Sequence, residues 1–582
     1  MRAQKRARNL YTPKNVTTEP LSYQHFKAEP NVRGSVPGPG VTALVLFSAI
    51  LVLTVARLEG ATVINANSAS QSDVAAAIGS ATNGDTIIIP AGTATWTRPL
   101  QVTKGITIQG AGTGVTIVKD GAQKGSLIDW TLAAGYRSRL TGIEFQDGGR
   151  IDTANAPGGM LHVDGSNTNG ATFRLDNCKW NNLNGVPVFD TVIGVIDHNI
   201  FIQDRNQTAI YIYGSGWDGR SFGDGSWAAP TRFGSSQFLF IEDNVFTHTG
   251  SYTRAVTDAH AGARFVVRHN AIFDAFIGNH GTESTGRVRG SRAMEVYQNA
   301  FTGTNLNRFI GGTRSGCAVV HDNNISGFQT TPLFTFHNHR SFFPFDPWGG
   351  ADGTNRWDVN SPTIFFSGTA AGNSSGTTVT VSGANWTPNQ WAGHVLRKLT
   401  DGCGSNTLTY GEIESNTSNA ITYTGNGGYP WKAPMAFCAG DHLEIRKVIH
   451  ALDQPGRARG SLIGGDSPSP RPNWNDQVTE PGYGWNNGTA RLAGGPGCTE
   501  GVHFINETPM PGYTPYTYPH PLVTGNPLPS GTPGSTAATR TSLRRPWGGK
   551  KQQETKGVKK SWRKSKENPS GQMAEGQEKP GQ

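Results

Sequence analysis

Segments with the 3.6-residue hydrophobic period of a helix are nearly absent from this chain of 582 residues. Glycine is abundant instead, with 76 residues, nearly twice its average usage. This pattern predicts an all-β protein. CxxC motifs and the usual spacings of Cys and His metal ligands are also absent, so the sequence predicts neither a zinc module nor a CxxC redox site.

A long hydrophobic run is missing as well. The longest apolar-dominated stretch, residues 41–56, is about sixteen residues and is short for a membrane span. A basic segment precedes it and Gly60 and Ala61 follow, which favours a secretory signal peptide. The forty residues before it are long for such a signal, so either the true start lies further along or the segment is an uncleaved anchor. Both cases predict a secreted, periplasmic or cell-surface protein, with a membrane contact only for the anchor.

The body of the chain has no net positive charge, although the formal net charge of the whole chain is +9. Residues 1–40 hold seven Lys or Arg against two Asp or Glu, and residues 526–582 hold twelve against four. The remaining body carries −4. Because the excess of positive charge is confined to the tails, we expect no nucleic-acid partner.

Cysteine is scarce, with five residues. Cys403 and Cys438 flank one small β-rich segment and could pair in an oxidising compartment. Cys178 and Cys317 lie among short apolar strands, so we expect both side chains to be buried in the core rather than paired.

An asparagine recurs between short apolar strands along the middle of the chain. The intervals are 22, 45 (about two periods), 26, 29 and 24 residues, typical of a solenoid. Asn also tolerates the left-handed backbone that a sharp corner requires. We therefore predict that stacked amides join successive coils at Asn177, Asn199, Asn244, Asn270, Asn299 and Asn323.

One helix is predicted, over residues 71–78, where Val74, Ala75 and Ile78 have helical spacing. A short amphipathic helix covers the exposed first coil of a solenoid. It leads into GDTIIIPAGT at 84–93 and ITIQGAG at 106–112. With the strand–Asn–strand coils, these motifs resemble the pectate-lyase-like superfamily of right-handed parallel β-helices, secreted bacterial type.

The resemblance covers residues 62–350 well and 450–525 more loosely, and GYTPYTYPHPL at 512–522 is similar to the closing segment of secreted bacterial members. It implies the fold far more than the reaction, because the superfamily includes lyases, hydrolases, esterases, epimerases and adhesins. The predicted divisions are a disordered basic extension (1–40), the signal or anchor (41–61), the β-helix (62–361), an inserted small β module (362–450), the last coils and a C-terminal cover (451–525), and a disordered basic tail (526–582).

Counting back from each Asn locates a third strand in every coil, which begins apolar and ends polar. Stacked strands lie about 4.8 Å apart, so the polar ends should form one outward row. In the resembling family this sheet carries the polysaccharide groove. A solvated sheet face is the plainer interpretation for any single residue, but the residue types favour a site at Asp164, Asp190, Tyr213, Asp258, His260, His280, Arg314, His337 and His339.

Two loops beside this sheet add candidates. Three Arg close together could bind uronate or sulfate groups through paired hydrogen bonds, although a loop tied to neighbouring coils explains them equally well. Aromatic rings could stack on sugars or plug the solenoid. The candidates are Glu283, Arg287, Arg289 and Arg292 in one loop and Trp217 and Trp227 in the other.

Three functions stay open. The favoured one is a polysaccharide lyase acting on an acidic glycan, with His280 or His260 as base and Arg314, or Ca²⁺ on Asp258, neutralising the developing charge. A non-catalytic glycan-binding adhesin would use the same groove. A glycoside hydrolase would need two carboxyls, and Asp164 and Asp190 lie on nearby coils. No cofactor other than Ca²⁺ is considered, and a monomer is expected.

Overall fold

The computed structural model describes residues 61–525, except 152–158, 206–207, 251–253, 282–287, 305–308, 338–357, 361–362, 404–409, 424–434, 447, 452, 458–478 and 496–497. Among these residues no helix is long and apolar enough to cross a membrane. The apolar run 41–56 and both basic tails lie outside the described residues.

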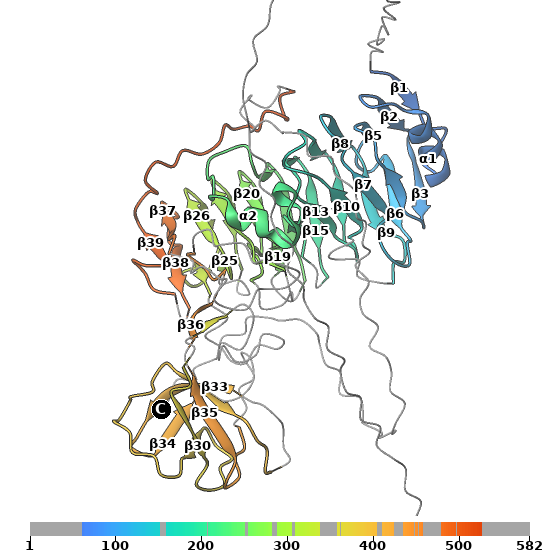
Figure 1. Cartoon of the computed structure of the whole chain (residues 1–582). Helices are drawn as coiled ribbons and strands as arrows, with labels where there is room; N and C mark the ends of the chain where they lie inside the picture. The colour runs from blue at the N-terminus through green and yellow to red at the C-terminus, as the bar shows by residue number, and fades with distance from the viewer. Residues whose placement is uncertain are drawn as a thin grey trace, which may run out of the picture. The chain divides into compact units, whose positions relative to one another are not determined.

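The described chain winds through three parallel sheets in turn, which confirms the right-handed parallel β-helix (Figure 1). Sheet A contains β1 (Val63–Asn65), β2 (Thr86–Ile89), β5 (Thr107–Gly110), β8 (Arg137–Thr141), β11 (Thr172–Asp176), β14 (Gly194–Asp197), β17 (Leu239–Glu242), β20 (Arg264–Arg268), β23 (Ala293–Tyr297), β26 (Cys317–His321), β37 (Gly482–Trp485) and β39 (Phe504–Asn506).

Sheet B follows sheet A in each coil and contains β3 (Gly92–Trp96), β6 (Thr116–Asp120), β9 (Glu144–Asp147), β12 (Lys179–Asn181), β15 (Ile200–Gln203), β18 (Val245–His248), β21 (Ala271–Phe273), β24 (Ala300–Thr302) and β27 (Asn324–Ser326). Sheet C completes the coil with β4 (Leu100–Val102), β7 (Ile128–Thr131), β10 (Leu161–Asp164), β13 (Pro187–Asp190), β16 (Ile210–Tyr213), β19 (Arg254–His260), β22 (Ala275–Ile277), β25 (Phe309–Thr313), β28 (Leu333–Phe336) and β38 (Arg491–Gly494).

The asparagine repeat forms a buried ladder at the corner between sheets A and B. The side chain of Asn244 accepts from the backbone N–H of Asn199 and donates to the side-chain oxygen of Asn270, at 2.9 and 3.0 Å. The same bonds continue from coil to coil, so each inward amide is satisfied. The ladder consists of Asn199, Asn244, Asn270, Asn299, Asn323 and Asn487.

Two details of the predicted corner are wrong. The left-handed residue is the one before each ladder asparagine, for example His198 or His269, and not the ladder asparagine itself. Asn177 is itself such a left-handed residue, and Cys178 fills the ladder position of its coil. A shift of one residue was enough to misplace Asn177, because consecutive residues at a corner have different backbone conformations.

The first coil is covered by α1 (Gln71–Ser80), which confirms the predicted helix. Ser70 caps it by accepting a hydrogen bond from the backbone N–H of Asp73. Val74 and Ile78 are buried as expected, but Ala77 takes the buried place predicted for Ala75. Val74, Ala77 and Ile78 have the spacing i, i+3 and i+4, which places all three on the helix face that packs on the coil.

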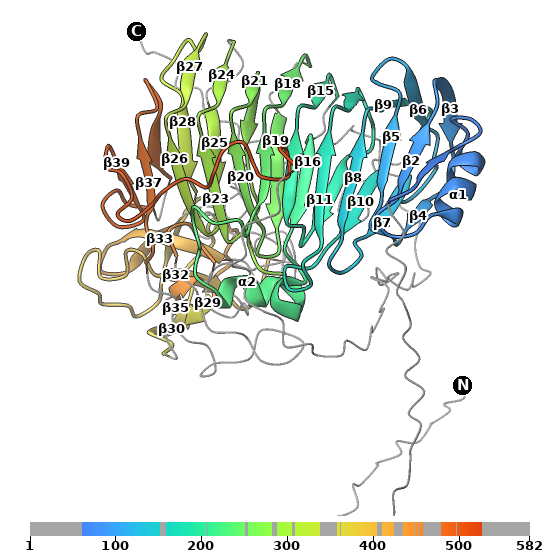
Figure 2. The ribbon, with the colours of Figure 1, turned by 90° about the horizontal axis from the view of Figure 1, so that it is seen from above.

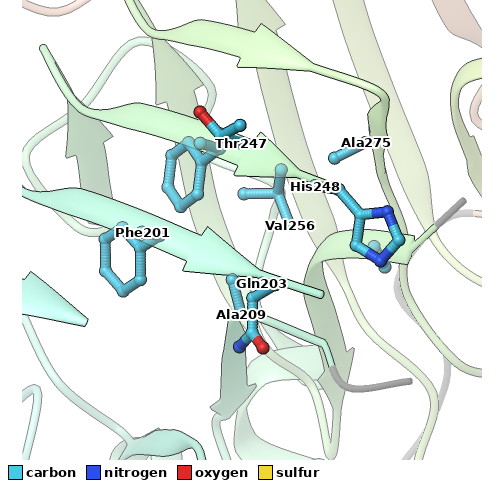
Figure 3. Close-up of a pocket in the computed structure, with 9 residues that line it drawn as sticks. Phe201, Gln203, Ala209, Thr247, His248, Val256 and Ala275 are labelled. Carbon is cyan, nitrogen blue, oxygen red and sulfur yellow. The ribbon is translucent and has the colours of Figure 1, made fainter. Parts of the chain in front are cut away.

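The interior of the coils is apolar, and sheet B contributes a column of stacked rings. Phe145, Trp180, Phe201 and Phe246 follow one another with centroids 4.6, 5.8 and 4.7 Å apart. A small pocket beside the last two rings lies between sheets B and C (Figure 3). Its lining is mostly apolar, with Gln203, Thr247 and His248 as the polar members, so we assign it to packing.

Part of the insertion folds as a separate antiparallel sheet. It contains β30 (Phe366–Thr369), β31 (Thr378–Thr380), β32 (Val395–Lys398), β33 (Tyr410–Asn416), β34 (Ala420–Tyr423) and β35 (His442–Arg446), with its own buried cluster. Cys403 and Cys438 form the expected disulfide, and Cys178 and Cys317 are buried. A two-stranded pair, β29 (Asp358–Asn360) with β36 (Val448–Ala451), flanks these strands in sequence.

After β39 the chain turns back across the outer face of sheet A (Figure 2). We call residues 507–525 the C-terminal strap. Arg268 donates to the carbonyl oxygens of Tyr516 and Thr517, at 2.6 and 2.8 Å. Arg174 reaches the carbonyl of Leu522. The strap therefore covers part of this face.

Candidate functional site

The outer face of sheet C carries two rows of polar side chains. Residues at alternate positions of β10 point outward, because Leu161 and Val163 are buried between them. The first row pairs Asp164, Asp190, Tyr213 and His260 in register across β10, β13, β16 and β19. This confirms the predicted strand register.

A second row stands two residues earlier on the same strands, and sequence reasoning missed most of it. Its polar members are Asp129, His162, Tyr211 and Asp258, and the buried Val188 takes the place between His162 and Tyr211 in the same register. His162 Nδ1 lies 3.0 Å from Asp129 Oδ1. Burial alone would lower the pKa of His162, but the Asp129 carboxylate outweighs it and the pKa is raised. Reading two positions back along each strand would have found this row.

Asp258, His260 and His280 form a compact group, which we call the His–Asp cluster. Asp258 and His260 project from the same face of β19, and His280 follows β22 in the next coil, where its N–H donates to Ala259 O at 2.8 Å. The Asp258 Oδ1 to His280 Nδ1 distance is 2.5 Å. The rings of His260 and His280 stack with centroids 4.2 Å apart.

The cluster is half-sheltered from solvent. The side chains of Asp258 and His260 are 11% and 8% exposed, while His280 is 25% exposed. Burial raises the pKa of Asp258, and the positive charges of His260 and Arg314 oppose that rise. His280 is therefore the member most accessible to a bound molecule.

Arg314 and Tyr213 flank the cluster. Arg314 is held by Asn279, whose Oδ1 accepts from the backbone N–H of Arg314 at 2.8 Å and whose carbonyl accepts from Nε at 3.0 Å. The ring of Tyr213 stacks on His260 with centroids 5.6 Å apart. Burial raises the pKa of the Tyr213 hydroxyl, which keeps it protonated at neutral pH.

The carboxylates of the first row differ from each other. Asp190 accepts hydrogen bonds from Ser215 N at 3.0 Å, from the Ser215 hydroxyl and from Thr191 Oγ1 at 2.9 Å. It fixes the chain that leaves β16. Of the two carboxyls considered for hydrolysis, Asp164 is exposed, whereas Asp190 is held by hydrogen bonds from a neighbouring turn.

The prediction that loop arginines bind uronate or sulfate groups is wrong for the two that the structure describes, Arg289 and Arg292. Arg289 is fully buried and donates to both carboxylate oxygens of Asp453 at 2.6 Å. Arg292 is also buried and donates to Glu480 at 2.9 Å. Asp453 and Glu480 lie more than 160 residues downstream, and a further partner of Arg289, Asp224 at 3.5 Å, lies 65 residues upstream, so local sequence could not identify them. Glu283 and Arg287 lie outside the described residues.

The two tryptophans are also packing residues. The Trp227 ring is buried with the guanidinium groups of Arg289 and Arg292 5.3 and 5.1 Å from its centroid, and its Nε1 donates to Gly290 O at 2.7 Å. Trp217 is 2% exposed and lies 5.0 Å from the Arg264 guanidinium. They belong to the segment η1 (Trp217–Gly219), η2 (Ser221–Gly223) and α2 (Asp224–Ala228). Neither ring is presented to a sugar.

The last predicted coil contributes little. The backbone N–H of His337 donates to Thr313 O at 3.0 Å, which places it beside β25, and its side chain is half-buried. His339 lies outside the described residues. The site that the structure assembles therefore centres on coils β16 to β25.

The His–Asp cluster also has the composition of a metal site. One donor atom from each of Asp258, His260 and His280 lies within 4.8 Å of the others. Two imidazoles and one carboxylate suit ions such as Zn²⁺ better than Ca²⁺, which prefers six to eight oxygen ligands. The donor set thus gives no particular support to the Ca²⁺ expectation for Asp258.

Comparisons with known proteins add no function. No protein-family model and no curated protein matches the chain. Among solved structures, ORF18 of Geobacillus virus E2 is 12% identical and covers 64% of this chain and 78% of its own, with a TM-score of 0.27. A tailspike mutant of E. coli bacteriophage HK620 in complex with a pentasaccharide is 11% identical (65% and 89% covered, TM-score 0.22), and the Dettilon tailspike is 9% identical (65% and 90%, TM-score 0.20). At such scores the fold assignment rests on the strand register alone.

Proposed function

We propose that this protein is a secreted polysaccharide lyase that binds an acidic glycan across the outer face of sheet C and cleaves it by β-elimination. The observation that carries the proposal is the 2.5 Å contact between Asp258 and His280. The His280 ring also stacks on that of His260, and the positive charge of Arg314 acts on Asp258. A carboxylate that orients an accessible imidazole is the arrangement of a general base.

We assign the roles as follows, with the contacts of the cluster as support. When Asp258 accepts a hydrogen bond from Nδ1 of His280, the lone pair on Nε2 is left to take the proton beside the uronate carboxylate. The negative charge of Asp258 stabilises the imidazolium that results. Arg314 supplies the positive charge that neutralises the uronate carboxylate while the carbanion-like charge develops.

Departure of the glycosidic oxygen requires a proton. The Tyr213 ring stacks on His260 one coil before the rest of the cluster, so its hydroxyl is our candidate proton donor. The C–H electron pair forms the new double bond, the C–O bond breaks, and the oxygen leaves with the Tyr213 proton. Solvent then returns the proton from His280 to Tyr213, which completes the cycle.

A hydrolase is the less supported alternative, because the hydrogen bonds from Ser215 and Thr191 hold Asp190 in a structural role. A glycan-binding protein without turnover would use the outward rings of Tyr211 and Tyr213 on β16. Either alternative predicts that the cluster is dispensable for the measured function.

The test is release of unsaturated product from a panel of polyuronates, followed by ultraviolet absorbance. Replacement His280→Gln should lower kcat/KM roughly 10²- to 10⁴-fold. The matched control is His198→Gln, which alters the His198–Asp197 pair at the end of β14 in sheet A, away from the proposed glycan face, and should stay within about twofold of wild type. New reducing ends without absorbance would favour hydrolysis. Binding without any product would favour the glycan-binding alternative.

A further inference from the structure

We propose that Asp258, His260 and His280 bind one divalent transition metal ion, with Zn²⁺ as the probe that defines the site. This inference does not rest on the proposed function, because it concerns binding by three side chains whose positions are already known. The three donors come from two adjacent coils and lie within 4.8 Å of one another.

The distances leave room for an ion after a small adjustment. Ligands about 2.0–2.1 Å from a tetrahedral Zn²⁺ are about 3.3 Å apart. Asp258 Oδ1 and His260 Nε2 are 3.8 Å apart, close to this spacing. The Asp258 to His280 contact of 2.5 Å is shorter and must open by about 1 Å for both groups to bind one ion.

The backbone already orders the donors. Asp258 and His260 are alternate residues of β19, and its pairing with β16 fixes both on the outer face. His280 is tied to β19 by its N–H bond to Ala259 O at 2.8 Å. Ordered ligands reduce the entropic cost of binding an ion. The partial exposure of His280 leaves an approach from solvent for a fourth ligand.

One neighbouring charge opposes the ion. The positive charge of Arg314 acts on Asp258, so a dication in the cluster would be repelled. We therefore expect that removal of the Arg314 charge strengthens binding of the metal ion. It also favours an anion, such as a carboxylate, as the fourth ligand.

The ion and the Asp258–His280 hydrogen bond exclude each other, because the same ring nitrogen and carboxylate oxygen serve both. If the protein is a lyase as proposed, Zn²⁺ should inhibit it at the concentration at which it binds. If it is not a lyase, direct binding still tests the metal site, so the two proposals fail separately.

The experiment is titration of the full, untagged, chelator-treated chain with Zn²⁺ by calorimetry, with Co²⁺ absorption reporting the ligand field. We expect one ion per chain and no comparable binding of Ca²⁺. Asp258→Asn, His260→Asn and His280→Asn should each weaken binding at least about tenfold. Arg314→Gln should strengthen it several-fold and does not remove a ligand, so it remains informative if a cluster variant fails to fold.

The control is His162→Asn, which removes one imidazole from the two-donor pair with Asp129 and should leave Zn²⁺ affinity within about twofold. His280→Cys should restore binding through a thiolate and shift the Co²⁺ spectrum. The proposal is overturned if no ion binds, if the cluster variants bind as wild type does, if His162→Asn weakens binding as much as His280→Asn, or if Ca²⁺ binds as tightly as Zn²⁺.

Discussion

The outer faces of sheets A and C both carry charged residues, yet they use them differently. On sheet A, bidentate ion pairs join neighbouring coils, as between Arg174 and Asp197 at 2.7 and 2.9 Å, and the C-terminal strap covers them. On sheet C the charges converge on the half-sheltered His–Asp cluster instead. The same alternation of strand residues thus produces a structural face and a candidate functional face, and what covers each face makes the difference.

The largest expected effect is on sheet A. Arg268 is fully buried and pairs with Glu242 at 2.6 Å. Arg268→Ala should lower the free energy of unfolding by about 3–5 kcal/mol, because it leaves a buried carboxylate unpaired. Denaturant unfolding measures this. In the control, Arg268→Met with Glu242→Leu, most of the loss should be recovered. A loss below about 1 kcal/mol for the single variant would contradict a structural role for this face.

The strap should also make stability depend on pH. Glu295 accepts a hydrogen bond from the Tyr513 hydroxyl at 2.6 Å, and burial raises the pKa of its carboxyl from the ordinary value of 4.5 to about 7. The folded state therefore holds the proton more tightly, so stability is lost as pH rises from about 4.5 through 7. Glu295→Gln should remove this loss, worth about 3 kcal/mol above pH 7.

Thermal unfolding of wild type and Glu295→Gln between pH 4 and 8 tests this sign. The two stabilities should be most similar at the acid end and diverge toward pH 8, with the Gln variant the more stable. Parallel curves would mean that the Glu295 carboxyl titrates alike in the folded and unfolded chains.

On sheet C we expect a smaller effect, with the same sign as at Glu295 and the opposite sign to the loss of Arg268. Because burial raises the pKa of Asp258, its ionised form is a cost to folding above its unfolded pKa. Asp258→Asn should leave stability unchanged or raise it by up to about 1 kcal/mol at neutral pH, while the cluster loses its function. Asp453→Asn is the matched control, and it should destabilise the fold because Arg289 loses its partner. Comparable destabilisation by both variants would place Asp258 among the structural pairs.

The smallest effect is expected at the exposed end of the first row. Asp164→Asn should change stability by less than about 0.5 kcal/mol. Asp197→Asn on sheet A removes the buried negative charge that accepts hydrogen bonds from Arg174. It should lower the free energy of unfolding by about 1–3 kcal/mol. Unfolding midpoints of the two variants give the comparison directly, and equal costs would erase the difference between the faces.

Much of the fold was predictable because it is periodic. The spacing of Asn199 to Asn323 identified the coils, and counting back from them placed Asp190, Tyr213 and His260 in one row. His162 and Tyr211 were within reach of the same rule. Arg289 and Arg292 were not, because nothing near them in sequence indicates Asp453 or Glu480 as partners.

By itself the sequence determined the solenoid, its register and the strand that carries the outward polar residues, since these follow from a short repeat and the two-residue alternation of a strand. Only the tertiary structure decided which polar residues remain accessible. The strap and the 215–229 segment return from elsewhere in the chain to cover some charges, whereas stacking of β19 against the next coil brings His280 to Asp258. Burial and pairing depend on such distant contacts, so residue type alone could not separate structure from function.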